Sequence, residues 1–158
     1  MNDMHGQRQI PTHICVLIVI AASFALGTAL DATGAAKVIA NELIRVAGGS
    51  PWLSLAVVYG IAMIFTELIT NNAAAVLVFP IAQATAQRLG VDFTPFVMAI
   101  MMAASASFST PIGYQTNLMV MGPGGYRFTD YFRIGIPLNL LMWGLTTLLV
   151  PLIWPFRP

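Results

Sequence analysis

Charged side chains are scarce in this sequence. Asp, Glu, Lys and Arg make up 8% of the 158 residues, whereas hydrophobic residues make up 58% and the mean hydropathy is +0.80. A soluble domain carries about 25% charged residues, so this chain has too few to cover a surface that faces water. The sequence therefore predicts an integral protein of the lipid bilayer. The net charge of +1, with scattered basic residues, excludes the basic patch that a nucleic-acid partner requires.

Cysteine and histidine are almost absent. The one cysteine, Cys15, excludes an intrachain disulfide and lies in an apolar run, where a small core residue is expected. His5 and His13 lie at the amino-terminal margin, and the sequence contains no His-Glu-x-x-His motif and no pair of aspartates inside an apolar run. The serines near 105 to 109 have no histidine close by in the sequence, as a Ser-His-Asp arrangement would require. We therefore expect no enzymatic activity.

Short polar segments divide the long apolar runs. The predicted segments are a polar lead-in at 1–13, a span at 14–31, an interfacial helix at 33–47, a helical pair at 51–88, an interrupted run at 93–123 and a last span at 131–155. The first span falls within the ~17–25 residues that a bilayer requires. The interfacial helix is predicted because its charged residues share one helical face and its apolar residues the other. Aromatic residues at both ends of the last span are typical of interfacial anchors.

Two polar clusters interrupt the apolar runs. The first is Thr66-Glu67-Leu68-Ile69-Thr70-Asn71-Asn72, and the second extends from Ser105 to Asn117. Polar groups at membrane depth cost free energy unless partners or ions satisfy them. Unwound backbone is tolerated there only where protein or a water-filled cavity covers it, and secondary transporters build their binding sites in this way. The clusters therefore favour a transport site. The alternative for the first cluster is a turn between two buried helices, capped by Asn71 and Asn72.

The residue types in both clusters suit a cation bound together with an anion. Sodium prefers oxygen ligands, and Thr66 and Thr70 lie one helical turn apart, close to Asn71 and the carbonyl of Ile69. The second cluster adds further oxygens and donors at Ser107, Ser109, Thr110, Thr116 and Asn117. No Lys or Arg lies inside an apolar run, so an anion would depend on helix dipoles, hydroxyls, amides and bound cations.

Three polar or aromatic side chains within the apolar runs need a separate explanation. Glu67 is the one acid within an apolar arm, and it fits either a cation site or proton relay, or a structural carboxylate hydrogen-bonded beside a helix end. We favour the structural role because a single unpaired acid makes a poor relay. Asn139 and Trp143 lie in the middle of the last span, where an interhelical hydrogen bond and packing are expected.

Three motifs together resemble one family of transporters. The segment Thr66-Glu67-Leu68-Ile69-Thr70-Asn71-Asn72-Ala73 resembles the hairpin-tip signature of the divalent anion:sodium symporter (DASS) family. The segment Ser109-Thr110-Pro111-Ile112-Gly113 resembles that family's helix break, and Ala25-Leu26-Gly27-Thr28-Ala29-Leu30-Asp31-Ala32-Thr33-Gly34 looks like the span before its interfacial helix. The motifs occur in the expected order, and the resemblance covers residues 14–156.

The resemblance implies an all-α membrane protein. This chain would be the C-terminal repeat of a secondary transporter that is built from two inverted repeats. It implies a re-entrant helical hairpin at 51–88, a broken transmembrane helix at 93–123, an N-terminal repeat as partner and a homodimer. The implied activity is sodium-coupled symport of a small anion, sulfate or a dicarboxylate, across the plasma (inner) membrane of a bacterium. The residues implied to hold sodium are Thr66, Asn71 and the carbonyls of Ile69 and Ser109. The residues implied to face the anion are Thr70, Asn71, Asn72, Thr110 and Pro111.

The sequence departs from the family at the hairpin tip. The family tip usually reads Ser-Asn-Thr, whereas Asn72 places an amide where the family has a hydroxyl. The run Gly122-Pro123-Gly124-Gly125-Tyr126-Arg127-Phe128 looks like a branch that carries regulatory TrkA-C-type domains and includes sulfate transporters, which favours sulfate over dicarboxylates. The alternatives are an arsenite or sodium/proton exchanger of similar architecture, and a non-transporting membrane subunit.

Overall fold

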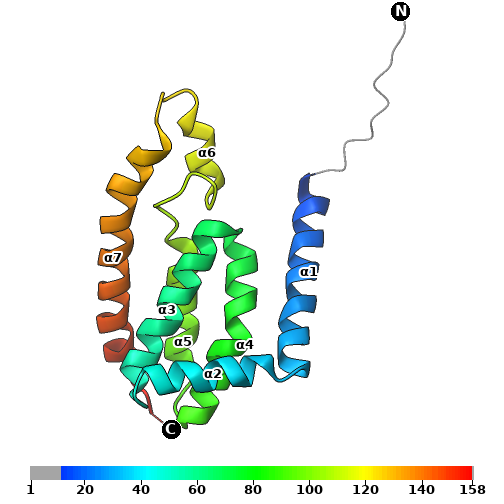
Figure 1. Cartoon of the computed structure of the whole chain (residues 1–158), viewed down its shortest axis with the longest axis vertical. Coiled ribbons are helices and arrows are strands. Elements are labelled where there is room, and N and C mark those ends of the chain that lie inside the picture. The colour runs from blue at the N-terminus through cyan, green and yellow to red at the C-terminus, as the bar shows by residue number, and fades with distance from the viewer. Residues whose placement is uncertain (1–11, 158) are drawn as a thin grey trace, which may run out of the picture.

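The described residues form an all-helical structure. A computed structural model describes residues 12–157 (Figure 1). Within that range its regular elements are α1 (Thr12–Ala32), α2 (Ala35–Val46), α3 (Pro51–Leu68), α4 (Asn71–Leu89), α5 (Thr94–Ser105), α6 (Gln115–Met121) and α7 (Phe128–Ile153). The predicted all-α class is therefore confirmed for this part of the chain. By length and composition, α3 and α7 are able to cross a membrane.

The antiparallel pair α3 and α4 lies at the centre of the molecule, and α5 packs against both helices. Helix α1 packs beside α4, whereas α7 packs on the opposite side against α3 and α5 (Figure 1). The short helix α2 crosses the lower ends of this bundle (Figure 1). In the same view, the turn between α3 and α4 lies below the upper ends of α1 and α7.

Small residues allow the three central helices to approach one another closely. Alanines of α3, α4 and α5 are completely buried, namely Ala62, Ala74, Ala82, Ala99 and Ala103. A few larger side chains, including Tyr59 and Phe96, fill the remaining space. Lipid provides no hydrophobic drive between helices, so close backbone packing of this kind holds a membrane bundle together. The outer face of α7 instead exposes large apolar side chains such as Ile134 and Leu152, as a surface in contact with lipid does.

Local sequence explains where α3 and α4 begin and end. Pro51 stands in the first turn of α3, where its missing N–H costs nothing. The chain becomes extended at Ile69 and Thr70, and α4 starts at Asn71. The N-cap of α4 is Thr70, whose hydroxyl accepts from the backbone N–H of Ala73 at 3.4 Å. The alternative in which Asn71 and Asn72 cap this turn is therefore wrong as to the cap, because both residues already belong to the helix.

Candidate functional site

The first interruption lies between α3 and α4. Only residues 69 and 70 separate the two helices, so the carboxyl end of α3 and the amino end of α4 meet at this turn. Thr66, in the last turn of α3, is completely buried. Its hydroxyl lies 2.8 Å from the Asn71 side-chain oxygen and 3.0 Å from the Ala104 carbonyl, and its single proton serves one of them at a time. Two oxygen-bearing side chains thus face each other across the turn.

The second interruption separates α5 from α6. The backbone leaves the α-helical conformation after Ser105 and regains it at Gln115. Several residues of this irregular segment are nevertheless buried, namely Ala106, Ser107, Ser109, Thr110, Pro111 and Gly113. Asn117 of α6 stabilises the segment, since its amide donates to the Ser107 carbonyl at 3.2 Å and the Thr110 carbonyl at 3.4 Å. Irregular backbone that protein covers in this way is the form tolerated at membrane depth.

Glu67 joins the two interruptions. One carboxylate oxygen accepts from the backbone N–H of Ser109 at 2.9 Å, and the other accepts from the backbone N–H of Thr110 at 2.8 Å. The Ser107 hydroxyl lies 3.4 Å from the second oxygen. In return, the Thr110 hydroxyl donates to the Glu67 carbonyl at 2.9 Å. Hydrogen bonds to a charged group are the strong ones, so the carboxylate fastens the irregular segment to the end of α3.

A third helix completes this arrangement. The side-chain amide of Asn139, from α7, donates to Glu67 Oε1 and to Ser109 Oγ, both at 2.7 Å. Asn139 is 4% exposed. We call Glu67, Ser107, Ser109, Thr110 and Asn139 the Glu67 cluster. A pocket of about 280 Å³ adjoins it between α3 and α7. The structure thus gives Glu67 the hydrogen-bonded structural role that the sequence favoured, and Asn139 the interhelical hydrogen bond expected of it.

Not every residue singled out in the sequence lies in these contacts. Thr66 and Asn71 lie together, and Ser109 and Thr110 lie against the end of α3. Pro111 is buried in the second interruption, whereas Thr70 and Asn72 are exposed at the tip of the turn. Among residues 12–157, no three His, Cys, Asp or Glu side chains gather as a metal-binding group. The ligand oxygens available at the interruptions are therefore mainly hydroxyl, amide and carbonyl oxygens.

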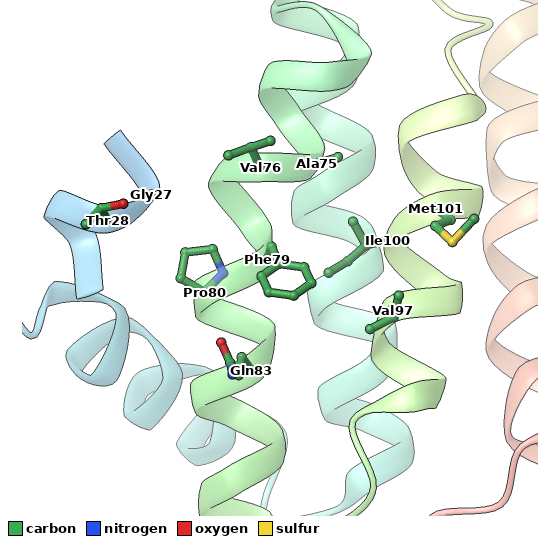
Figure 2. A pocket seen from close by; sticks show the side chains of 10 residues that line it. All are labelled: Gly27, Thr28, Ala75, Val76, Phe79, Pro80, Gln83, Val97, Ile100 and Met101. Carbon is green, nitrogen blue, oxygen red and sulfur yellow. The ribbon is translucent and has the colours of Figure 1, made fainter. Parts of the chain in front are cut away.

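Another pocket, of about 540 Å³, lies between α1, α4 and α5 (Figure 2). Thr28 and Gln83 are the polar side chains in its lining, and the rest is apolar, including Phe79, Pro80 and Ile100. A small anion needs several convergent donors in place of its water shell. This pocket therefore lacks the chemistry of an anion site.

Buried irregular backbone between interrupted helices, in an apolar helical molecule, is the arrangement in which secondary transporters build their binding sites. Comparison with known families agrees, since residues 9–157 match the citrate transporter (CitMHS) family. The chain belongs to this family and is therefore an integral membrane protein. The match confirms the resemblance at the level of the ion-transporter superfamily.

Individual relatives agree with this assignment. A protein of Synechocystis described as an uncharacterized transporter is 43% identical over 144 residues, covering 90% of this chain and 24% of the relative. Sodium/sulfate cotransporter 1 of Chlamydomonas reinhardtii is 36% identical, covering 79% of this chain and 14% of its own length. Sodium-dependent high-affinity dicarboxylate transporter 3 of Caenorhabditis elegans is 27% identical, and the match covers 84% of this chain and 24% of the relative. The chain thus spans about a quarter or less of the length of these relatives.

Proposed function

We propose that this chain is the C-terminal repeat of a sodium-coupled symporter for small divalent anions, sulfate or dicarboxylates, in the plasma membrane of a bacterium. One observation carries the proposal: two interrupted helical segments, rich in oxygen atoms, are held against each other by Glu67. The family, and relatives named as sodium/sulfate and dicarboxylate cotransporters, support this class of substrate.

The proposed cation ligands are the side chains of Thr66 and Asn71 and the carbonyls of Ile69 and Ser109. The contact of 2.8 Å between Thr66 and Asn71 supports this choice, since two side-chain oxygens already converge there. Arg88, in the last turn of α4, is the one basic residue of α3, α4 and α5. An anion at the hairpin tip therefore finds no Lys or Arg beside it on these helices. Co-bound sodium supplies the positive charge, which explains why the anion requires the cation.

The proposed anion ligands are Thr70, Asn71, Asn72, Thr110 and Pro111. The first three stand at the amino end of α4, where backbone N–H groups and the helix dipole attract negative charge. Thr110 and Pro111 present the second interruption beside the end of α3. Asn72 offers amide donors in place of a hydroxyl, which suits the several oxygens of sulfate. The segment 122–128, similar to that of a branch with regulatory TrkA-C-type domains, also favours sulfate.

The proposed architecture places 51–88 in the membrane as a re-entrant hairpin. The low position of the turn between α3 and α4, below the upper ends of α1 and α7, supports it (Figure 1). An N-terminal repeat completes the binding site, and two such proteins form a homodimer. The greater length of the relatives leaves room for that second repeat.

Uptake by the complete transporter tests the proposal. Membrane vesicles that contain it are given labelled sulfate, succinate or citrate on the outside under an inward sodium gradient, with a potassium gradient as reference. We expect sodium-dependent uptake of sulfate, abolished by Asn71→Ala at normal expression. Asn41→Ala is the matched control, because Asn41 contacts Arg88 far from both interruptions. Wild-type sodium dependence in Asn71→Ala would refute the assigned role. Collapse of the flux by a protonophore, with the sodium gradient held constant, would instead identify an exchanger.

A further inference from the structure

The backbone geometry at Ser109 and Thr110 determines where one carbonyl points. In a planar trans peptide group, the N–H and the C=O point in opposite directions. The N–H of Thr110 and the C=O of Ser109 belong to the same peptide group, and this N–H donates to Glu67 at 2.8 Å. The Ser109 carbonyl therefore points away from Glu67. The N–H of Ser109 donates to the other carboxylate oxygen at 2.9 Å, so the preceding peptide group is held as well.

The direction of the Ser109 carbonyl therefore depends on where the Glu67 carboxylate sits. A glutamate side chain is flexible, and its terminal torsion is broad. Asn139 restrains it, because one amide hydrogen binds Glu67 Oε1 at 2.7 Å and the other binds Ser109 Oγ at 2.7 Å. An asparagine amide has two donors, so both bonds form at once. Asn139 is therefore bonded at the same time to the carboxylate and to the residue whose carbonyl the carboxylate directs.

Asn139 belongs to α7, which forms neither interruption. One turn further along α7, the indole N–H of Trp143 donates to the Ala56 carbonyl of α3 at 2.8 Å. This second bond also holds α7 against α3, but it ends on a backbone oxygen outside the Glu67 cluster. The hydrogen bonds of Asn139 restrain Glu67, which in turn orients the Ser109 carbonyl. The hydrogen bond of Trp143 has no such connection to the Ser109 carbonyl. Trp143 is therefore a matched reference for the loss of contact between α7 and α3.

We propose that Asn139 is a positioning residue for sodium: acting through Glu67, it directs the Ser109 carbonyl toward the cation. The inference rests on the proposed function, in which this carbonyl is a sodium ligand. Asn139 itself contacts Glu67 and Ser109 Oγ rather than the ion. Its loss should weaken sodium binding while leaving the turnover of the sodium-saturated transporter largely intact.

The test uses the purified and reconstituted complete transporter with Asn139→Ala, Asn139→Leu and Trp143→Phe. Leucine keeps the branched heavy-atom framework of asparagine and removes the donors, so it separates the loss of hydrogen bonding from the loss of packing. Two quantities are measured: the half-saturating sodium concentration for uptake at saturating anion, and the rise in melting temperature when sodium replaces choline at constant ionic strength. Loss of a hydrogen bond to a charged group should raise the half-saturating sodium concentration roughly tenfold in both Asn139 variants. The maximal uptake rate should recover at high sodium, and Trp143→Phe should stay within about twofold of the wild type.

Each other outcome is decisive. The inference fails if Asn139→Leu keeps the wild-type sodium requirement, if Trp143→Phe shifts it as far, or if only the maximal rate falls. If both Asn139 variants fail to fold, Glu67→Gln carries the test, because its amide nitrogen cannot accept a backbone N–H. The same sodium shift in that variant supports the inference, and an unchanged requirement overturns it. A wild type without any sodium dependence would instead refute the proposed function.

Discussion

Gly113 and Ser107 approach each other so closely that a Cβ on Gly113 would lie 2.2 Å from Ser107 Oγ. The same Cβ would lie 2.5 Å from the Thr66 carbonyl at the end of α3. The second interruption therefore reaches the first at a position where only glycine fits. This close approach allows the Glu67 cluster to form.

Gly113→Ala should consequently force the two interruptions apart. Because the Thr66 carbonyl is backbone and cannot rotate away, we expect a loss of roughly 1–3 kcal/mol from overpacking. The measurement is thermal unfolding in detergent, followed by tryptophan fluorescence. Gly60→Ala on α3 is the control, since a Cβ there meets no atom within 4 Å. A melting temperature of Gly113→Ala equal to that of Gly60→Ala would contradict the predicted contact.

Gly135 makes the corresponding approach from α7. A Cβ on this residue would lie 2.2 Å from the Phe108 carbonyl oxygen. Replacement of an exposed helical glycine by alanine normally stabilises a helix by up to about 1 kcal/mol, but at Gly135 we expect destabilisation instead. Gly144→Ala, in the same helix, has open space around its Cβ and should stabilise. We therefore expect the melting temperature to fall in Gly135→Ala and to rise in Gly144→Ala. A change of the same sign in both variants would show that α7 does not pack on the second interruption as described.

Asp92, in the loop between α4 and α5, should make stability depend on pH. Its carboxylate accepts from the backbone N–H and the hydroxyl of Thr94, both at 3.0 Å. These bonds, the backbone bond first, hold the pKa of Asp92 below its ordinary value. A pKa that is lower in the folded state favours folding above the unfolded-state pKa, and this contribution is lost as pH falls through the folded-state pKa.

The Asp92 prediction is tested with Asp92→Asn, which does not titrate. The melting temperature of the wild type is followed from neutral pH into the acid range. We expect the decline in this range to be shallower in Asp92→Asn, because the contribution of Asp92 is already missing at neutral pH. Thr94→Val removes one of the two donors to Asp92. Its decline in melting temperature should therefore be intermediate between those of the wild type and Asp92→Asn. Parallel curves for all three proteins would rule out the linkage.

Part of this arrangement follows from local sequence. A low content of charged residues predicts the helical membrane class, and polar residues in apolar runs indicate where helices are interrupted, as at Thr70 and Ser109. The pattern does not indicate which polar groups meet. Asn139 lies 72 residues from Glu67, and an amide within an apolar helix is compatible with any neighbouring helix as its partner. A hydrogen bond between residues so far apart in the sequence depends on how α7 packs against α3. The local pattern of apolar and polar residues does not predict it.

The N-cap of α4 shows a second limit. Thr70, Asn71 and Asn72 are all suitable cap residues by type, so their identities do not say which one stands at the boundary. The boundary is set by where the chain becomes extended, at Ile69 and Thr70. A shift of one residue changes which side chains point to solvent and which to the helix end. The sequence places Asn71 close to Thr66, and the structure adds the direct contact of 2.8 Å between their side-chain oxygens.

Thr66→Val gives the sharpest test of the proposed cation site, because valine keeps the shape of threonine and removes only the hydroxyl oxygen. If that oxygen binds sodium, the half-saturating sodium concentration for uptake should rise roughly tenfold or more, as for the loss of one strong ligand contact. Thr85→Val is the matched control. Thr85 is also completely buried, but its hydroxyl donates at 2.7 Å to the Ile81 carbonyl of its own helix. Each variant should lose a similar stability of about 1 kcal/mol, so a merely structural role predicts equal sodium curves. A role at the cation site, as a ligand or through the hydrogen bond to Asn71, predicts that the curve of Thr66→Val moves while that of Thr85→Val coincides with the wild type.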